Sequence, residues 1–255
     1  MAQYWLKYGN SVLSKSGSNI LVGSPYDPYN PLELPPYTIR CKFSSGTVPT
    51  EGTQRTLVDS TNNIWDILYP VNDWTYLFDN DNTLLEIIGA NTALVTRFTN
   101  CFYKCENLRT VSLFDTRNSA TLYGIFRYCS AIEALPLFSL DAGPDMSYAF
   151  EGDTSLSNLP YFNLENVSNI TSMCNGCTGL TSIPLFDTHN IAIMNYAFRG
   201  CTNVQTGALA LYQQASTQTT PPSYYRDAFK NCGSGTTSGA AELAQIPASW
   251  GGTAT

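Results

Sequence analysis

One pattern of apolar residues and cysteine recurs along this chain every 24 residues. The pattern is a phenylalanine followed by a cysteine three positions later, an aliphatic residue six positions later and a second aliphatic residue nine positions later. Successive copies begin at Phe78, Phe102, Phe126, Phe150, Cys174 and Phe198. The register holds without insertion from Phe78 to Val204. Because a unit this short buries its apolar face only against its neighbours, the copies are expected to stack in order.

The spacing within each copy predicts a fold class. A period of roughly 20 to 29 residues with L-x-x-L-x-L spacing is typical of leucine-rich repeats. We therefore predict an α/β fold, a leucine-rich-repeat solenoid with a short parallel sheet. The strand would lie at 108–114, with Leu108, Val111 and Leu113 pointing inward, and the segment 123–131 would be a short helix or helical turn. The column that starts at Leu113 continues as Leu137, Tyr161, Leu185 and Leu209.

The two flanks differ from the repeats in composition. Residues 1–74 are dense in Pro and Gly and contain one alternating stretch, YTIRCKF, so we predict a small β-rich N-terminal module. Residues 75–204 are assigned to the solenoid. Residues 205–255 contain AFKNC, which repeats AFRGC after 31 residues instead of 24. This irregular last copy is expected to act as a C-terminal cap.

Composition excludes several functions. Charged residues make up 13% of the chain and the net charge is −7, and no cluster of Lys and Arg exists that could bind nucleic acid. No apolar stretch approaches the roughly 18 residues of a membrane-spanning helix. The first residues lack the apolar region of a secretory signal. We therefore expect no nucleic acid partner and no membrane insertion.

Eight cysteines could suggest disulfides or a metal site. Cys105, Cys129, Cys177 and Cys201 occupy one position of the repeat. Neighbouring copies could be joined by disulfides, or each thiol could fill a gap in the core. The spacing of 174 and 177 superficially resembles a zinc knuckle. Because these cysteines belong to the repeat columns, the core interpretation is favoured, and we predict no metal and no other cofactor.

No residues stand out as a catalytic set. The lone histidine, His189, takes the place that Arg117 holds in an earlier copy, which is typical of an exposed turn residue. A column of Asn and Asp follows the predicted strands at Asn91, Asp115, Asn163 and Asp187. Paired carboxylates for acid–base chemistry and a calcium site are alternatives, but hydrogen bonds to turn backbone explain the column better. We predict that the chain is not an enzyme, and keep a surface hydrolase using His189 as a weaker alternative.

Recognition is instead expected on the exposed strand positions, which vary from copy to copy while the core columns do not. The candidate binding residues are Arg109, Thr110, Ser112, Glu133, Ser157, Asn158, Thr181 and Ser182. A plain solvated sheet is the alternative interpretation of the same positions.

The motif F-x-x-C-x-x-L-x-x-(I/L)-P-L-F-D-T, carried by residues 126–138 and 177–188, resembles the BspA-like leucine-rich repeats of bacterial surface proteins. The resemblance covers about residues 78–232. It implies a surface protein of the kind implicated in adhesion. The repeats are also similar to those of tail-fibre or other virion proteins from phages of gut Bacteroidales. In those proteins, a stretch that resembles the N-terminal part of this chain precedes the repeats. Departures occur at Asp81 and Asp153, which replace the cysteine, and at Cys174, which replaces the phenylalanine.

The resemblance sets the functional expectation. The first hypothesis is a non-enzymatic phage virion component, a tail fibre or capsid decoration protein, located in the virion and joined to other virion proteins through the N-terminal module. Similarity to fibre proteins also implies a homotrimer. The alternative is an adhesin on the bacterial cell surface or outside the cell that binds a host protein or glycan through the repeats.

Overall fold

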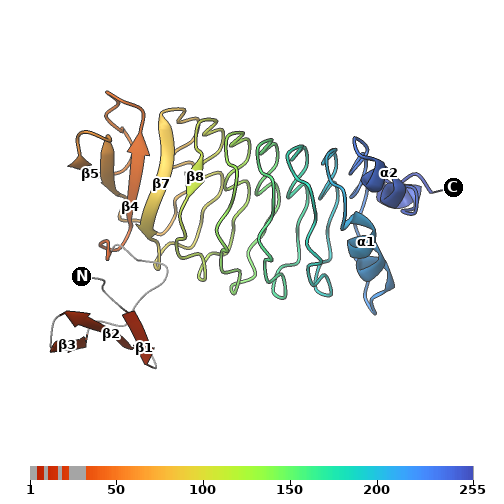
Figure 1. The fold of residues 1–255 in the computed structure, drawn as a ribbon, viewed down its shortest axis with the longest axis horizontal. Coiled ribbons are helices and arrows are strands. Elements are labelled where there is room, and N and C mark those ends of the chain that lie inside the picture. The colour runs from red at the N-terminus through yellow and green to blue at the C-terminus, as the bar shows by residue number, and fades with distance from the viewer. Residues whose placement is uncertain (1–4, 9–10, 17–18, 23–32, 255) are drawn as a thin grey trace.

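The computed structural model describes residues 5–8, 11–16, 19–22 and 33–254 (Figure 1). Three strands near the N-terminus form an antiparallel sheet in the order β1-β2-β3. Their bounds are Trp5–Tyr8 for β1, Ser11–Ser16 for β2 and Asn19–Val22 for β3.

A second, five-stranded sheet has the order β5-β6-β4-β7-β8. Its strands are β4 (Thr38–Phe43), β5 (Gln54–Asp59), β6 (Ile64–Leu68), β7 (Leu84–Asn91) and β8 (Thr110–Val111). The strand predicted in YTIRCKF is confirmed as β4, where Ile39, Cys41 and Phe43 are buried in strict alternation. The pairs β4/β6, β4/β7 and β5/β6 are antiparallel, whereas β7/β8 is parallel.

β7 connects this sheet to the repeats. Its residues Glu86 and Ile87 pair with Thr110 and Val111, which follow them by 24 positions. Its other edge pairs with β4, so the antiparallel strands lie against the first repeat (Figure 1). The division into segments 1–74, 75–204 and 205–255 stays a prediction.

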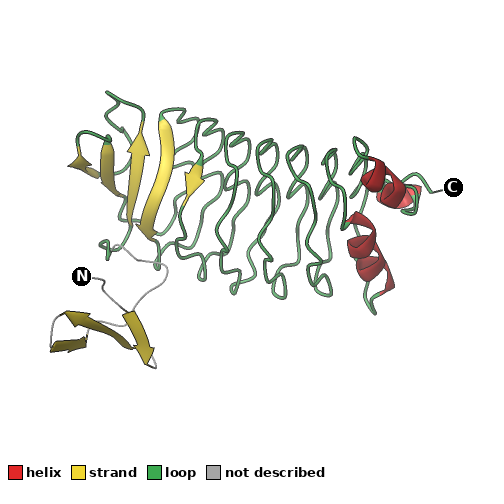
Figure 2. Ribbon diagram, viewed as in Figure 1, coloured by secondary structure: helices red, strands yellow, loops and turns green. Residues whose placement is uncertain are grey.

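Beyond β8 the chain runs as a row of similar turns lying side by side (Figure 2). Each turn has two sides. We call the side formed by 97–107, 121–131, 145–155, 169–179 and 193–203 the turn side. The side formed by 108–115, 132–139, 156–163 and 180–187 is the leucine side.

On the turn side, alternate N–H groups bond to the next turn. The Phe102 N–H donates to the Ile125 carbonyl oxygen, and the Lys104 N–H donates to the Arg127 carbonyl oxygen, both at 2.9 Å. Between them, the Tyr103 N–H donates back to the Asn100 carbonyl oxygen at 3.1 Å. The backbone polar groups of this side therefore link neighbouring turns, although no regular strand or helix forms there.

The predicted α/β leucine-rich-repeat solenoid is wrong. The described residues form mostly β structure, with a five-stranded mixed open sheet and only two short α-helices. Both helices lie near the C-terminus, after the regular 24-residue copies, so none of those copies contributes a helix. The strand expected at 108–114 is reduced to the two residues of β8.

Backbone conformation explains the missing helix. In the segment 123–131, Gly124 and Tyr128 have φ values of 59° and 63°. A left-handed residue every fourth position interrupts the right-handed geometry that an α-helix needs throughout. The same pattern recurs in the next turn at Tyr148 and Gly152.

The predicted inward column at Leu113 is also wrong. Burial on the leucine side follows every third residue, as in Leu108, Val111 and Phe114, instead of every second residue. Phe114 and its counterparts Phe138, Phe162 and Phe186 therefore face the core. The residue before each of them is displaced outward: Leu137, Tyr161 and Leu185 are exposed.

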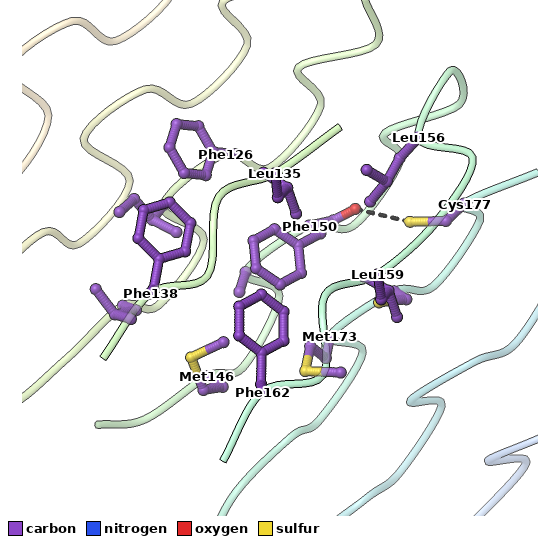
Figure 3. Close-up of a cluster of buried hydrophobic side chains, with 14 of the residues drawn as sticks. Phe126, Leu135, Phe138, Met146, Phe150, Leu156, Leu159, Phe162, Met173 and Cys177 are labelled. Atoms are coloured by element: carbon purple, nitrogen blue, oxygen red, sulfur yellow. Dashed lines mark hydrogen bonds between the residues drawn. The ribbon is translucent and has the colours of Figure 1, made fainter. Parts of the chain in front are cut away.

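The core is a double row of phenylalanines with sulfur between the turns (Figure 3). Phe150 stacks on Phe162 with ring centroids 5.9 Å apart, and Phe126 stacks on Phe138 at the same distance. The Cys177 thiol donates to the Phe150 carbonyl oxygen at 2.9 Å (Figure 3). Packing of the two sides against each other thus holds each turn together.

The C-terminal part carries α1 (Ala208–Thr217), α2 (Thr237–Leu243) and the 3₁₀ turn η1 (Ala248–Trp250). α1 is inserted between two turns, and the Met194 N–H still bonds to the Tyr224 carbonyl oxygen at 2.7 Å. Trp250 stacks on Tyr225 with centroids 4.1 Å apart and is buried. Among the described residues, no helix has the length and apolar character needed to cross a membrane.

Candidate functional site on the leucine side

The eight candidate binding residues lie together on the leucine side. The exposed ones are Arg109, Thr110, Glu133, Asn158 and Thr181, and the half-buried ones are Ser112, Ser157 and Ser182. Backbone hydrogen bonds set consecutive copies side by side. The Ser157 N–H donates to the Glu133 carbonyl oxygen at 3.3 Å, and the Thr181 N–H donates to the Ser157 carbonyl oxygen at 3.1 Å. Equivalent residues of neighbouring turns therefore form columns, but whether they bind a partner stays a prediction.

Side-chain hydrogen bonds hold the small polar residues of this surface. The Ser157 hydroxyl donates to the Glu133 carbonyl oxygen and the Thr181 hydroxyl donates to the Ser157 carbonyl oxygen, both at 3.3 Å. The Asn158 amide donates to the Ser157 hydroxyl oxygen at 3.1 Å. Neither Arg109 nor Glu133 forms an ion pair within the described part of the chain. Both charges are therefore available to a partner.

An apolar column beside these residues was missed by the sequence analysis. Leu137 is 56% exposed, Tyr161 is 62% exposed and Leu185 is 50% exposed, each one turn from the next. Each directly precedes a buried phenylalanine, and two adjacent side chains of an extended segment cannot both face the core. The sequence signal for the exposed column was therefore an apolar residue directly before each core phenylalanine, in the pairs L-F, Y-F and L-F. Together with the candidate residues, the column makes a surface with polar and apolar strips side by side.

The cysteine column belongs to the core. All eight cysteines are free and buried. Cys105, Cys129 and Cys201 donate their thiols to carbonyl oxygens 27 residues earlier, at 2.9 to 3.0 Å. Burial raises the pKa of the Cys129 thiol well above its usual range. A buried thiol with a raised pKa is a poor nucleophile, so Cys129 contributes to packing.

Asp153 takes the place of a thiol in that column. It is fully buried, and its Oδ1 accepts the Cys129 N–H at 2.8 Å. Its Oδ2 is buried without a hydrogen-bond partner. Burial, with a smaller contribution from Cys177, raises the pKa of this carboxyl well above its ordinary value. The group is therefore a buried acid of the core, remote from the exposed surface.

Three members of the Asn and Asp column bond to turn backbone, as predicted, whereas the Asn91 amide donates to the Leu34 carbonyl oxygen at 2.7 Å. Asp115 Oδ1 accepts the Arg117 N–H at 3.0 Å and Asn163 Oδ1 accepts the Glu165 N–H at 3.1 Å. Asp187 Oδ1 accepts the His189 N–H at 3.0 Å and lies 2.7 Å from the His189 ring nitrogen Nδ1. These bonds to His189 lower the pKa of Asp187. Within residues 33–254, no three His, Cys, Asp or Glu side chains gather where they could hold a metal ion.

The repeats match one protein family. Residues 72–181 and 144–226 each match the family described as "Mycoplasma protein of unknown function, DUF285". The two matches overlap and together span more than half of the chain. No curated protein and no solved structure matched the chain. The chain therefore belongs to the DUF285 family of BspA-like repeat proteins.

Proposed function

We propose that this chain is a non-enzymatic attachment protein that binds its partner through the leucine-side surface. The observation that carries the proposal is the exposed column of Leu137, Tyr161 and Leu185 next to copy-varying polar residues. Contiguous exposed apolar side chains rimmed by polar groups are typical of interaction sites. Hydroxyl and amide groups beside them supply directional hydrogen bonds.

As the setting of this attachment we propose a phage virion, in a tail fibre or a capsid decoration protein. The resemblance of the repeats to virion proteins supports it. The N-terminal strands would then join other virion proteins, and the repeats would meet the host surface. A second candidate, a bacterial cell-surface adhesin for host protein or glycan, is favoured by the family description, which names a cellular bacterium.

A triple variant tests the binding surface. Leu137→Ser, Tyr161→Ser and Leu185→Ser in one full-length chain remove the apolar column without touching the core. The probes are the purified proteins encoded by the genes flanking this one, and an array of bacterial and host glycans. We expect wild type to bind at least one probe and the triple variant to lose that binding. The control is Val48→Ser, an exposed residue outside the repeats.

The outcomes separate the settings. Binding to tail or capsid proteins through residues 1–74 supports the virion. Binding only to host glycan or protein supports the adhesin. Equal binding by wild type and the triple variant would show that the leucine side is not the attachment surface. A hydrolytic activity of the wild-type chain that is lost in His189→Ala would overturn the non-enzymatic proposal.

A further inference from the structure

A second column of residues runs along the outer surface of the turn side. Backbone N–H groups of successive turns donate, in the same way, to the carbonyl oxygens of its members, at 2.7 to 2.9 Å. The members are Arg127, Glu151, Asn175, Arg199 and Lys230. The step from Arg199 to Lys230 is 31 residues, because α1 is inserted there. The column therefore places Glu151 one turn after Arg127, and Lys230 one turn after Arg199.

Arg127 shows how an arginine in this column is neutralised. Its Nε donates to Glu151 Oε2 at 2.5 Å, from the following turn. The guanidinium carbon lies 4.9 Å from the centre of the Tyr128 ring and 4.7 Å from that of Tyr148. The other oxygen of Glu151 accepts the Asn175 amide at 2.7 Å. The complete arrangement is a guanidinium on tyrosine faces with a carboxylate from the next turn.

Arg199 also lies beside a tyrosine ring, here one from its own turn, and without a carboxylate partner. Its guanidinium carbon lies 5.5 Å from the centre of the Tyr196 ring. The next turn offers Lys230 in place of an acid, and the Arg226 guanidinium lies 5.8 Å from the same Tyr196 ring. Within the described residues neither arginine forms an ion pair, and both are exposed. Lys230 is 3.4 Å from Asp227 Oδ2.

Two guanidiniums without ion pairs beside one ring concentrate positive charge at this place, and a bound anion would neutralise it. A planar carboxylate is the anion that guanidinium groups bind with two parallel hydrogen bonds. Tyr224, two residues before Arg226, is 60% exposed. A tyrosine face next to a carboxylate site matches the apolar face of a sugar ring that carries an acid group.

We propose that Arg199, Arg226 and Tyr196 form a binding site for the carboxylate of an acidic saccharide, with Tyr224 packing against the sugar ring. The site lies on the turn side, so it is independent of the leucine-side surface and of the function proposed for it. The missing carboxylate of the column is supplied by the ligand.

The test is titration calorimetry of the full chain with trigalacturonate at low ionic strength. Maltotriose is the neutral arm, and a hexaglutamate peptide is the acidic arm without sugar. We expect trigalacturonate to bind, maltotriose not to bind, and hexaglutamate to bind more weakly. Arg199→Gln and Arg226→Gln should each weaken binding roughly tenfold or more, because each loses a charge-assisted hydrogen bond. Binding should weaken as salt is added.

Two further variants make the test specific. Lys230→Glu puts a carboxylate where Glu151 stands relative to Arg127. This carboxylate should pair with Arg199 in place of the ligand and so suppress binding, while circular dichroism should show that the chain stays folded. Arg55→Gln, at an exposed arginine of β5 outside the repeats, should bind like wild type. Equal loss in Arg55→Gln and Arg199→Gln, unchanged binding in Lys230→Glu, or absence of trigalacturonate binding would each overturn the proposal. If hexaglutamate binds more tightly than trigalacturonate, the proposal of a saccharide ligand is overturned and the site is assigned to an acidic protein.

Discussion

The turn side and the leucine side are made from the same 24-residue copies, yet they have opposite properties. On the turn side, every second N–H bonds to the neighbouring turn, and thiols fill the space beneath. On the leucine side, fewer backbone bonds join the turns, and Leu137, Tyr161 and Leu185 are exposed. Backbone hydrogen bonds between turns concentrate on one side. Substitutions at the exposed positions of the other side are free to change what the surface meets. The predictions below measure this asymmetry.

The largest difference is expected between Phe150 and Tyr161. Phe150 is fully buried on the turn side and stacks on Phe162. Phe150→Ala should lower the free energy of unfolding by about 3 to 5 kcal/mol, as for other buried aromatic truncations. Tyr161→Ala, on an exposed side chain, should change it by less than about 0.5 kcal/mol. Urea titration followed by circular dichroism measures both changes in the free energy of unfolding. Similar losses would show that the exposed leucine-side residue contributes as much to stability as the buried turn-side residue.

Left-handed backbone on the turn side gives the next effect. Gly152 and Gly176 occupy one position of successive turns with φ values of 78° and 77°. Either change to Ala should cost about 1 to 2 kcal/mol of stability, because L-residues are strained there. A Cβ on Gly152 would lie 2.2 Å from Tyr128 Cδ1, whereas one on Gly176 would meet nothing closer than 4.0 Å. Thermal unfolding should therefore show a larger loss for Gly152→Ala, and the reverse order would contradict this packing.

Asp153 makes the turn side sensitive to pH. Its pKa in the folded state lies above the ordinary value of 3.8. At a pH between the ordinary pKa and the folded-state pKa, the folded chain keeps a proton that the unfolded chain has released. Stability should then fall as pH rises above about 4, by at most ~1.4 kcal/mol per pH unit. Asp153→Cys restores the column residue and should remove this slope, with its gain over wild type largest at neutral pH.

Urea titrations at several pH values between about 4 and 8 check the Asp153 prediction, over the range where carboxyl groups titrate. Thr154→Cys, at an exposed neighbour, is the matched control and should keep the slope. A slope that survives in Asp153→Cys would place its origin in another group.

The smallest effect is expected on the leucine side. Leu185→Ser replaces a side chain that is 50% exposed and should change the unfolding free energy by no more than about 0.5 kcal/mol. The same variant should weaken partner binding if the leucine-side surface is the attachment site. Chemical denaturation and a binding assay on the same preparation separate the two effects, and a large stability loss would mean that this column belongs to the core.

The sequence period was informative about which residues are buried. Phe102, Cys105 and Leu108 and their counterparts in later copies lie in the core, as the column pattern predicted. The local conformation was not predictable in the same way. Tyr128 and Tyr148 adopt positive φ, which tyrosine side chains do not signal, and the helix prediction failed for that reason. Gly152, Gly176 and Gly200, at one position of consecutive turns, were the clearest hint of left-handed backbone.

The candidate surfaces were partly accessible to sequence reasoning. Arg109, Glu133 and Thr181 were identified because they vary between copies, and they lie on one side of the structure. Leu137 and Leu185 were assigned inward because apolar residues were expected to alternate as in a strand, whereas burial here repeats every third residue. The equivalence of Arg199 and Lys230 follows from the alignment of AFRGC with AFKNC, but their place in neighbouring turns, on either side of the inserted α1, came from the structure.

The pairing of β4 with β7 also closes one end of the row of turns. A row of turns with open ends would present unpaired N–H and carbonyl groups at each end, and such edges are templates for pairing with another chain. At the first repeat, that edge is occupied by an antiparallel strand. At the far end, the Phe229 N–H bonds to the Trp250 carbonyl oxygen at 2.9 Å, and the Trp250 ring lies 6.4 Å from that of Phe229. At both ends, a segment that is not a repeat therefore takes the place of the next turn, which is where a second copy of the chain would otherwise pair.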